Sequence, residues 1–194
     1  MKFNYWHWFG IVVVVGLTGV IGGERYASHL EQDNNFCGSC HTQPETEYLA
    51  RFDSAVAQSN ATDLAAFHHR KDVKCIDCHT GEGIIGRGEV FSLATWDAIK
   101  HFTGIQRQPA TIVVPVQNEA CIKCHQDTMT TTGFNNHEHN KMLDPAAPFI
   151  RCTDCHVSHR VGVESEAFQF RDAILPQCEY CHTKIGRGPR GLTK

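Results

Sequence analysis

The sequence predicts a mainly α-helical chain with much irregular structure, in which one N-terminal transmembrane helix precedes a single folded domain. Three observations lead to this fold class. Residues 5–23 carry no formal charge, all 10 cysteines fall in repeated copies of Cys-x-x-Cys-His, and little chain separates one copy from the next. The 194 residues have a net charge of −3 and 41% hydrophobic residues, so the composition suggests neither a disordered nor a nucleic-acid-binding protein.

The run from Tyr5 to Gly23 predicts a membrane anchor, which we place at residues 1–25. At helical rise this run is about 28 Å long, close to the hydrocarbon thickness of a bilayer. Charged residues lie on both sides of it, and Tyr5, Trp6 and Trp8 occupy the position of an interfacial aromatic belt. We therefore expect a single-pass protein of the cytoplasmic membrane, with the domain on the periplasmic face.

A cleaved signal peptide is the alternative to an anchor. It would need a small-x-small cleavage site after the apolar run, and the best candidates, around Gly22 and Gly23, fit that pattern poorly. Gly19 and Gly23 also form a small-xxx-small pair. This pair is equally consistent with a neighbouring transmembrane helix and with ordinary glycine use.

The repeated pentapeptide has the spacing of covalent c-type haem attachment. In such a site both thiols form thioethers with the haem vinyl groups, and the adjacent histidine is the proximal ligand of the iron. The sequence thus predicts five covalently bound haem c groups. The thioether cysteines would be Cys37, Cys40, Cys75, Cys78, Cys121, Cys124, Cys152, Cys155, Cys178 and Cys181, and the proximal ligands His41, His79, His125, His156 and His182.

Three other uses of the cysteines fit the pattern less well. Zinc sites use paired Cys-x-x-Cys units, but nothing in them requires a histidine directly after every second cysteine. A thioredoxin-like motif would occur once, near a βαβ pattern. A disulfide framework would not repeat one pentapeptide. Haem attachment explains all ten cysteines together.

Residues 26–183 are expected to form a pentahaem cytochrome c domain packed around its haems, because only about 29 residues per motif leave too little chain for a layered core. Helices are predicted over 45–57 and 88–102 from apolar spacing. Prolines favour an extended course over 106–118 and a loop over 143–149. The last residues, 184–194, are basic and rich in glycine, which predicts a flexible tail, with docking to a partner as the alternative.

The distal ligands are predicted from the histidines and methionines outside the motifs. Because these histidines slightly outnumber the five irons, we expect mostly bis-histidine, low-spin haems. His68 and His69 are neighbours and cannot face the same iron, and His159 cannot easily fold back onto the iron of its own motif. If every iron is six-coordinate, no position is open for substrate, so no catalytic residue is predicted. The candidates are His29, His68, His69, His101, His137, His139, His159 and Met142.

Several segments resemble the membrane-anchored multihaem cytochromes of the NapC/NirT family, which pass electrons from quinol to exported reductases. The resemblance covers the anchor and the first four motifs. It is carried by HHRKDVKCIDCH at 68–79, AIKHFTG at 98–104, VQNEACIKCH at 116–125 and CTDCHVSHR at 152–160. By this resemblance His101, His159 and one of the pair His68 and His69 become distal-ligand candidates.

Two features depart from that family. Quinol-oxidising members carry a methionine two positions after the first motif, where this chain has Gln43, and a fifth motif is present at 178–182. Five motifs behind one anchor are similar to the pentahaem subunit of alternative complex III. This resemblance implies an electron-transfer subunit of a quinol:acceptor oxidoreductase, respiratory or photosynthetic, rather than a catalyst by itself. Its donor would be integral-membrane and iron–sulfur subunits and its acceptor an exported cytochrome c. The alternative is a stand-alone NapC/NirT-type quinol dehydrogenase feeding an exported reductase.

Overall fold

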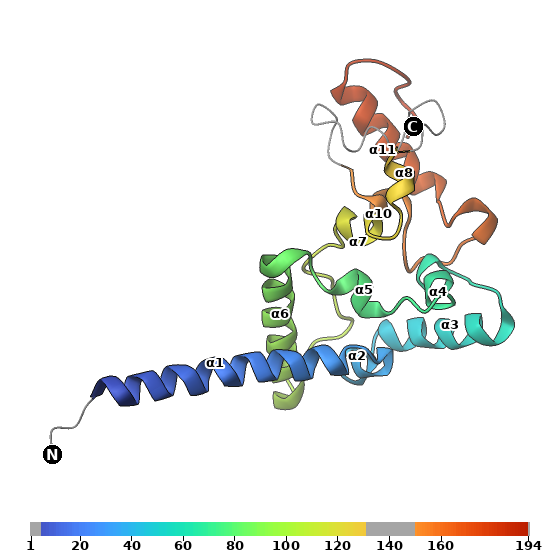
Figure 1. The fold of residues 1–194 in the computed structure, drawn as a ribbon. Coiled ribbons are helices and arrows are strands. Elements are labelled where there is room, and N and C mark those ends of the chain that lie inside the picture. The colour runs from blue at the N-terminus through green and yellow to red at the C-terminus, as the bar shows by residue number, and fades with distance from the viewer. Residues whose placement is uncertain (1–4, 131–149, 194) are drawn as a thin grey trace.

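The computed structural model describes residues 5–130 and 150–193, which form a mainly helical structure (Figure 1). No β-strand occurs in these two ranges; a single isolated bridge pairs His156 with Gln169. The prediction of a mainly α-helical chain with one N-terminal apolar helix is therefore confirmed. The predicted loop at 143–149 and the ligand candidates His137, His139 and Met142 lie outside the described residues.

The helices follow one another along the chain with short irregular connections. They are α1 (Tyr5–Leu30), α2 (Asn34–Cys40), α3 (Glu45–Gln58), α4 (Leu64–His69), α5 (Cys75–His79), α6 (Gly83–Thr103), α7 (Asn118–Ile122), α8 (Gln126–Thr130), α10 (Cys152–Cys155), the 3₁₀ turn η2 (Glu164–Glu166) and α11 (Arg171–Lys184).

Helix α1 projects from the domain and is long and apolar enough to cross a membrane (Figure 1). None of its residues is buried, and it continues past the apolar run to Leu30. Its polar last turns contact the domain, where Arg87 of α6 donates to Glu31 Oε2 at 2.6 Å and to Ser28 Oγ at 2.9 Å. The anchor and the first part of the domain are thus joined through one continuous helix.

The two predicted helices of the domain are present. Helix α3 matches the prediction over 45–57, and α6 contains the predicted 88–102 but begins five residues earlier, at Gly83. Gly81 permits this early start, because its φ is +75° and a Cβ at this position would collide with the carbonyl of Gly86. Residues 106–117 are free of helix, as the prolines predicted.

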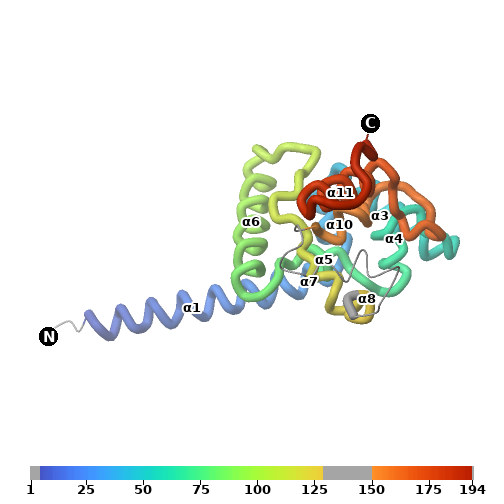
Figure 2. Tube along the Cα trace, turned by 90° about the horizontal axis from the view of Figure 1, so that it is seen from above, coloured from blue at the N-terminus to red at the C-terminus, as the bar shows by residue number. Residues whose placement is uncertain are grey.

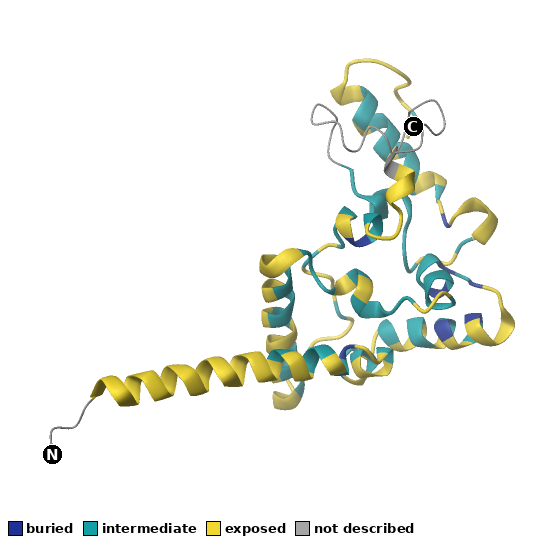
Figure 3. Cartoon of the chain, in the orientation of Figure 1, coloured by how far each residue is buried: buried dark blue, intermediate teal, exposed yellow. Residues whose placement is uncertain are grey.

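The side-chain core of the described residues is small. Its buried apolar members are Phe52, Ala55, Ala61, Ala66, Ala120 and Phe168. Most of the remaining chain is only half-buried or exposed, as the teal and yellow ribbon shows (Figure 3). Folded chains of this length ordinarily bury about 70% of their surface around large apolar side chains. Alanines and two phenylalanines do not supply such an interior.

Candidate functional site

The five Cys-x-x-Cys-His motifs lie on short helices that touch one another in chain order. Helix α2 contacts α5, α5 contacts α7, α7 contacts α10, and α10 contacts α11. In two perpendicular views these helices form a continuous series from the end of α1 to the C-terminal helix (Figures 1 and 2). The motif cysteines lie on these helices or in the turn directly after them, and none of the ten forms a disulfide. The fold therefore brings all the motifs together in a row.

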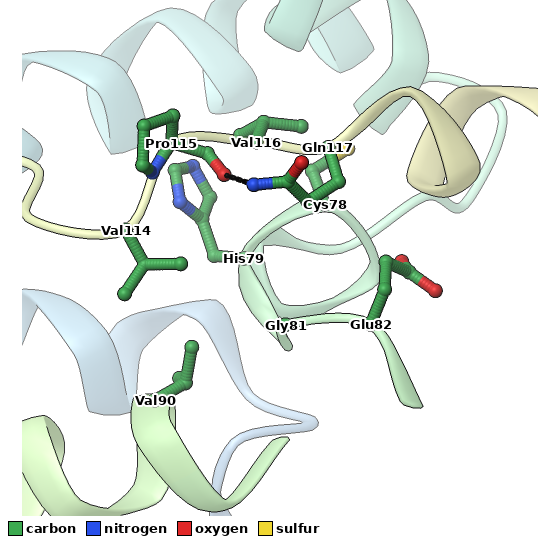
Figure 4. A pocket seen from close by; sticks show the side chains of 9 residues that line it. All are labelled: Cys78, His79, Gly81, Glu82, Val90, Val114, Pro115, Val116 and Gln117. Atoms are coloured by element: carbon green, nitrogen blue, oxygen red, sulfur yellow. Dashed lines mark hydrogen bonds between the residues drawn. The ribbon is translucent and has the colours of Figure 1, made fainter. Parts of the chain in front are cut away.

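His159 lies beside the histidine of the second motif rather than beside its own. The rings of His79 and His159 have centroids 6.3 Å apart and planes that differ by only 16°. His79 ends α5, whereas His159 belongs to the loop after α10, so the pair joins two distant parts of the chain. A segment at 114–117 covers His79 on one side, around a cavity of about 10 Å³ (Figure 4).

His159 is held in this place by contacts with α3. Its ring stacks on Tyr48 at a centroid distance of 4.0 Å. Arg51 donates to the carbonyl oxygen of His159 at 2.9 Å and to the Asp63 carboxylate at 3.0 Å. The flanking backbone is fixed as well, since Ala65 N donates to Ser158 O at 2.9 Å. His159 is therefore positioned by side chains and by the backbone on both sides of it.

A second pair joins the end of α4 to the third motif. The ring centroids of His68 and His125 are 6.0 Å apart, and their planes are nearly perpendicular, at 87°. His68 Nδ1 lies 2.9 Å from the carbonyl oxygen of Leu64. A carbonyl can only accept, so Nδ1 carries the proton and Nε2 keeps its lone pair. This is the tautomer in which imidazole binds a metal through Nε2.

The neighbouring His69 has the opposite arrangement. Its ring stacks on Phe52 at a centroid distance of 4.8 Å, and its Nδ1 lies 3.3 Å from Asn34 Nδ2. The amide of Asn34 is oriented by its other bond, in which Oδ1 accepts from the Cys75 N–H at 3.0 Å. Asn34 Nδ2 thus donates to His69, so the proton of neutral His69 sits on Nε2. The structure distinguishes two histidines that are equivalent in sequence.

Both ring spacings fit two axial ligands of one iron. A metal–imidazole nitrogen bond is about 2 Å long and the ring centre lies about 1.2 Å beyond the nitrogen, so opposite ligands of one iron have centroids about 6.4 Å apart. The pairs His79–His159 and His68–His125 are at 6.3 and 6.0 Å. Burial, and secondarily the nearby His79, lower the pKa of His159 to about 4. His159 is therefore neutral at pH 7, as a metal ligand must be.

The first motif is different, because its histidine faces a carboxylate. His41 Nε2 lies 4.0 Å from Asp97 Oδ2 of α6, and its buried Nδ1 makes no hydrogen bond. His101, one turn further along α6, has Nδ1 at 2.8 Å from Gln106 Oε1, and the amide of Gln106 donates to the carbonyl of Cys40. His101 is therefore linked to the first motif through Gln106. Asp97 carries no motif signature and was not predicted from the sequence.

The fourth and fifth motifs have histidines whose Nδ1 atoms meet backbone carbonyls. His156 Nδ1 lies 3.1 Å from Ala167 O, and His182 Nδ1 lies 2.7 Å from Arg187 O. Both contacts leave Nε2 as the acceptor nitrogen, as in His68. Gly188 makes the second contact possible, since its φ is +95° and a Cβ there would overlap the His182 ring.

The end of the basic tail folds back onto the fifth motif. Glu179, between the two cysteines of α11, accepts from Thr193 Oγ1 at 2.6 Å and from Gly191 N at 3.2 Å. Together with the contact between Arg187 and His182, these bonds bring the tail against α11 at several points. The last candidate, His29, lies in the final turn of α1, at an open hollow also lined by Asp33 and Phe36.

A repeated hydrogen-bond pattern links the motifs in pairs, and the sequence analysis missed it. An asparagine three residues before the first cysteine of motifs one and three caps the cysteine N–H of the next motif. Asn34 Oδ1 accepts from Cys75 N at 3.0 Å, and Asn118 Oδ1 accepts from Cys152 N at 2.8 Å. Within each pair the leading thiols, Cys37 with Cys75 and Cys121 with Cys152, are hydrogen-bonded.

The second motif of each pair also repeats an aspartate between its cysteines. Asp77 Oδ2 accepts from Lys74 N at 2.7 Å, and Asp154 Oδ2 accepts from Arg151 N at 2.8 Å. Each bond fixes the first turn of a motif helix. Motifs one and two therefore form one unit, motifs three and four form a second unit of the same design, and α11 adds the fifth motif.

Asp63 is expected to be the residue that most stabilises the site without belonging to it. Its carboxylate is fully buried, accepts from Ala66 N at 2.7 Å at the start of α4, and pairs with Arg51. Asp63→Ala removes this cap and strands Arg51, which should cost about 3 kcal/mol of unfolding free energy. Urea denaturation of the full-length chain in detergent, followed by circular dichroism, measures it.

The exposed Asp53 of α3 provides the matched control for Asp63. Asp53→Ala should change the unfolding free energy by no more than about 0.5 kcal/mol. Equal destabilisation by the two substitutions would show that the buried ion pair does not hold α3, α4 and the His159 loop together.

Among residues 5–130 and 150–193 no three His, Cys, Asp or Glu side chains converge as a metal-ion site of the zinc type would require. The donor set is instead a series of histidine pairs and thiol pairs, which suits a planar cofactor with iron at its centre. Comparisons of this chain with protein-family models, with curated proteins and with solved structures find no match.

Proposed function

We propose that this chain is a membrane-anchored pentahaem cytochrome c that relays electrons. The observation that carries the proposal is the pairing of His79 with His159 and of His68 with His125, at the spacing of two axial ligands on one iron. Each pair combines the histidine of a motif with one from a distant segment. Bound haem supplies one-electron exchange between ferrous and ferric iron.

The chain itself would contribute attachment, ligation and order. Ten cysteines are available for thioether bonds, and His41, His79, His125, His156 and His182 for the proximal positions. Both axial sides of the second and third sites would be filled by histidine, which leaves no position there for a substrate and favours relay over catalysis. The contact of the motif helices in chain order supports a continuous path from the end of α1 to α11.

The place of this relay follows from the sequence resemblance and from α1. We infer a periplasmic haem domain tethered to the cytoplasmic membrane, working within a quinol-oxidising complex. Its donor would be integral-membrane and iron–sulfur subunits, and its acceptor an exported cytochrome c. Copurification of such subunits with the chain from detergent-solubilised membranes would support this place, and isolation of the chain alone would speak against it.

A second candidate function has one observation in its favour. The open hollow between the ends of α1 and α2, lined by His29, Leu30, Asp33 and Phe36, lies beside the first motif at the end of the apolar span. A quinol could reach this position from the membrane. A stand-alone quinol dehydrogenase would then be reduced by a menaquinol analogue without any partner, whereas the relay subunit would not.

A redox titration of the purified chain tests the relay directly. Full reduction should take up five electrons per chain, and the ferric protein should have a low-spin spectrum at most of its haems. A spectrum dominated by high-spin, ligand-exchangeable haem would contradict the proposal, because it would show open coordination positions where the structure pairs histidines.

A further inference from the structure

Helix α6 has an amphipathic pattern opposite to that of an ordinary surface helix. Its 21 residues expose large apolar side chains, with Ile84, Ile85 and Phe102 at 94%, 87% and 84% exposure, and Trp96 and Ile99 about half exposed. Glu89 is the only charged residue among its exposed positions. A water-facing helix surface normally carries most of the charged residues, so this face is suited to a different environment.

The other charged side chains of α6 point away from this face. Arg87 turns to α1, where it pairs with Glu31 at 2.6 Å and Glu24 at 3.6 Å. Asp97 and Lys100 pair with each other, and Asp97 also faces His41. The polar groups of α6 are thus used inside the protein, and the apolar ones are left outside.

The contacts of Arg87 fix the height of α6 relative to the anchor. Glu24 and Glu31 lie in the turns of α1 directly after the apolar run that ends at Gly23. In two perpendicular views α6 runs crosswise to α1, on the side of the domain from which α1 projects (Figures 1 and 2). If α1 crosses the bilayer, α6 therefore lies along its surface at the level where the apolar span ends.

We propose that α6 is a membrane-surface helix whose face of Ile84, Ile85, Trp96, Ile99 and Phe102 inserts among the lipid head groups and upper acyl chains. A helix with one apolar face and few charges on it binds in this way, and tryptophan favours the interfacial region. The apolar face of α6 and the exposed apolar surface of α1 adjoin at the same height, so a single bilayer covers both. The occupant is therefore lipid rather than a protein partner.

This contact would fix the orientation of the domain. A single anchor helix leaves a domain free to turn about the membrane normal and to tilt, whereas a second contact along α6 prevents the tilt. The first motif, which is joined to α6 through the contact of His41 with Asp97, would then stay at a constant height above the bilayer. The inference requires that α1 spans the membrane, but it does not depend on haem.

Photocrosslinking of the full-length chain in nanodiscs of phosphatidylcholine and phosphatidylglycerol tests the inference. Photoreactive benzoylphenylalanine replaces Phe102 in one variant and Ile85 in a second. Both side chains are exposed, so neither replacement should disturb the fold. Tyr180 of α11 is the aromatic, exposed control far from α6, and Val14 in the middle of α1 is the positive control for the anchor. Mass spectrometry of the digested protein measures lipid adducts at each position.

Several-fold more lipid adduct at positions 102 and 85 than at 180 is the expected result. Adducts at 14 with only the level of the Tyr180 control at 102 and 85 would overturn the inference while leaving the anchor intact. Absence of adducts at all four positions would overturn both. Crosslinks from position 102 to another protein in native membranes, without lipid adducts in nanodiscs, would equally overturn it, because a partner subunit would then cover the face.

Discussion

His159→Ala is expected to convert one of the five haems from low-spin to high-spin and to let the reduced chain bind one carbon monoxide. The structure places the His159 ring opposite His79 at 6.3 Å, with nearly parallel planes. Removing it would leave the iron at the second motif with one axial histidine and one open position. The expected change is therefore about one fifth of the total haem, measured by ferric electron paramagnetic resonance and by titration with carbon monoxide.

Two additional measurements separate lost ligation from a general disturbance of the loop. Added imidazole should restore the low-spin signal of the His159→Ala protein, since it can occupy the open position. Val161→Ala changes an exposed side chain of the same loop and should leave every haem low-spin. A His159→Ala protein with an unchanged spectrum would show that another residue binds opposite His79.

His68→Ala and His69→Ala are expected to have different effects although the residues are neighbours. His68 lies opposite His125 with Nε2 available, whereas His69 stacks on Phe52 and accepts from Asn34. His68→Ala should therefore produce one high-spin, carbon-monoxide-binding haem per chain at the third motif. His69→Ala should keep all haems in their original spin state and affect stability alone.

The same spectroscopic measurements check this second prediction, and the two variants serve as controls for each other. A high-spin haem in His69→Ala with none in His68→Ala would reverse the assignment of the pair. A double substitution of His68 and His159 should give two open positions per chain, because the two ligands belong to different motifs. One open position in the double variant would show that both histidines serve the same iron.

The sequence was sufficient for the features that depend on neighbouring residues. The apolar run from Tyr5 to Gly23 predicted α1, apolar spacing predicted α3 and most of α6, and prolines marked the extended stretch before α7. The beginning of α6 was missed because Gly83, Gly86 and Gly88 argue locally against a helix. The contacts of Arg87 with α1 hold that first turn in place, and such long-range contacts are not visible in a local pattern.

The pairing of ligands could not be predicted for the same physical reason. Whether His159 faces its own motif or another is decided by Tyr48 and Arg51, which belong to a helix far away in the sequence. His68 and His69 differ only in which side of α4 they occupy. The repeated asparagines Asn34 and Asn118, in contrast, could have been found by aligning the first two motifs with the next two. The assignments of His29 and His101, and of the three candidates between 131 and 149, remain predictions.

Intact-mass spectrometry of the purified full-length chain tests the central claim most directly. If porphyrins on thioether bonds form the interior of this domain, the measured mass should equal that of the polypeptide plus five haem groups, and it should not change on denaturation. The mass of the bare polypeptide, or haem that is lost when the chain unfolds, would contradict the claim.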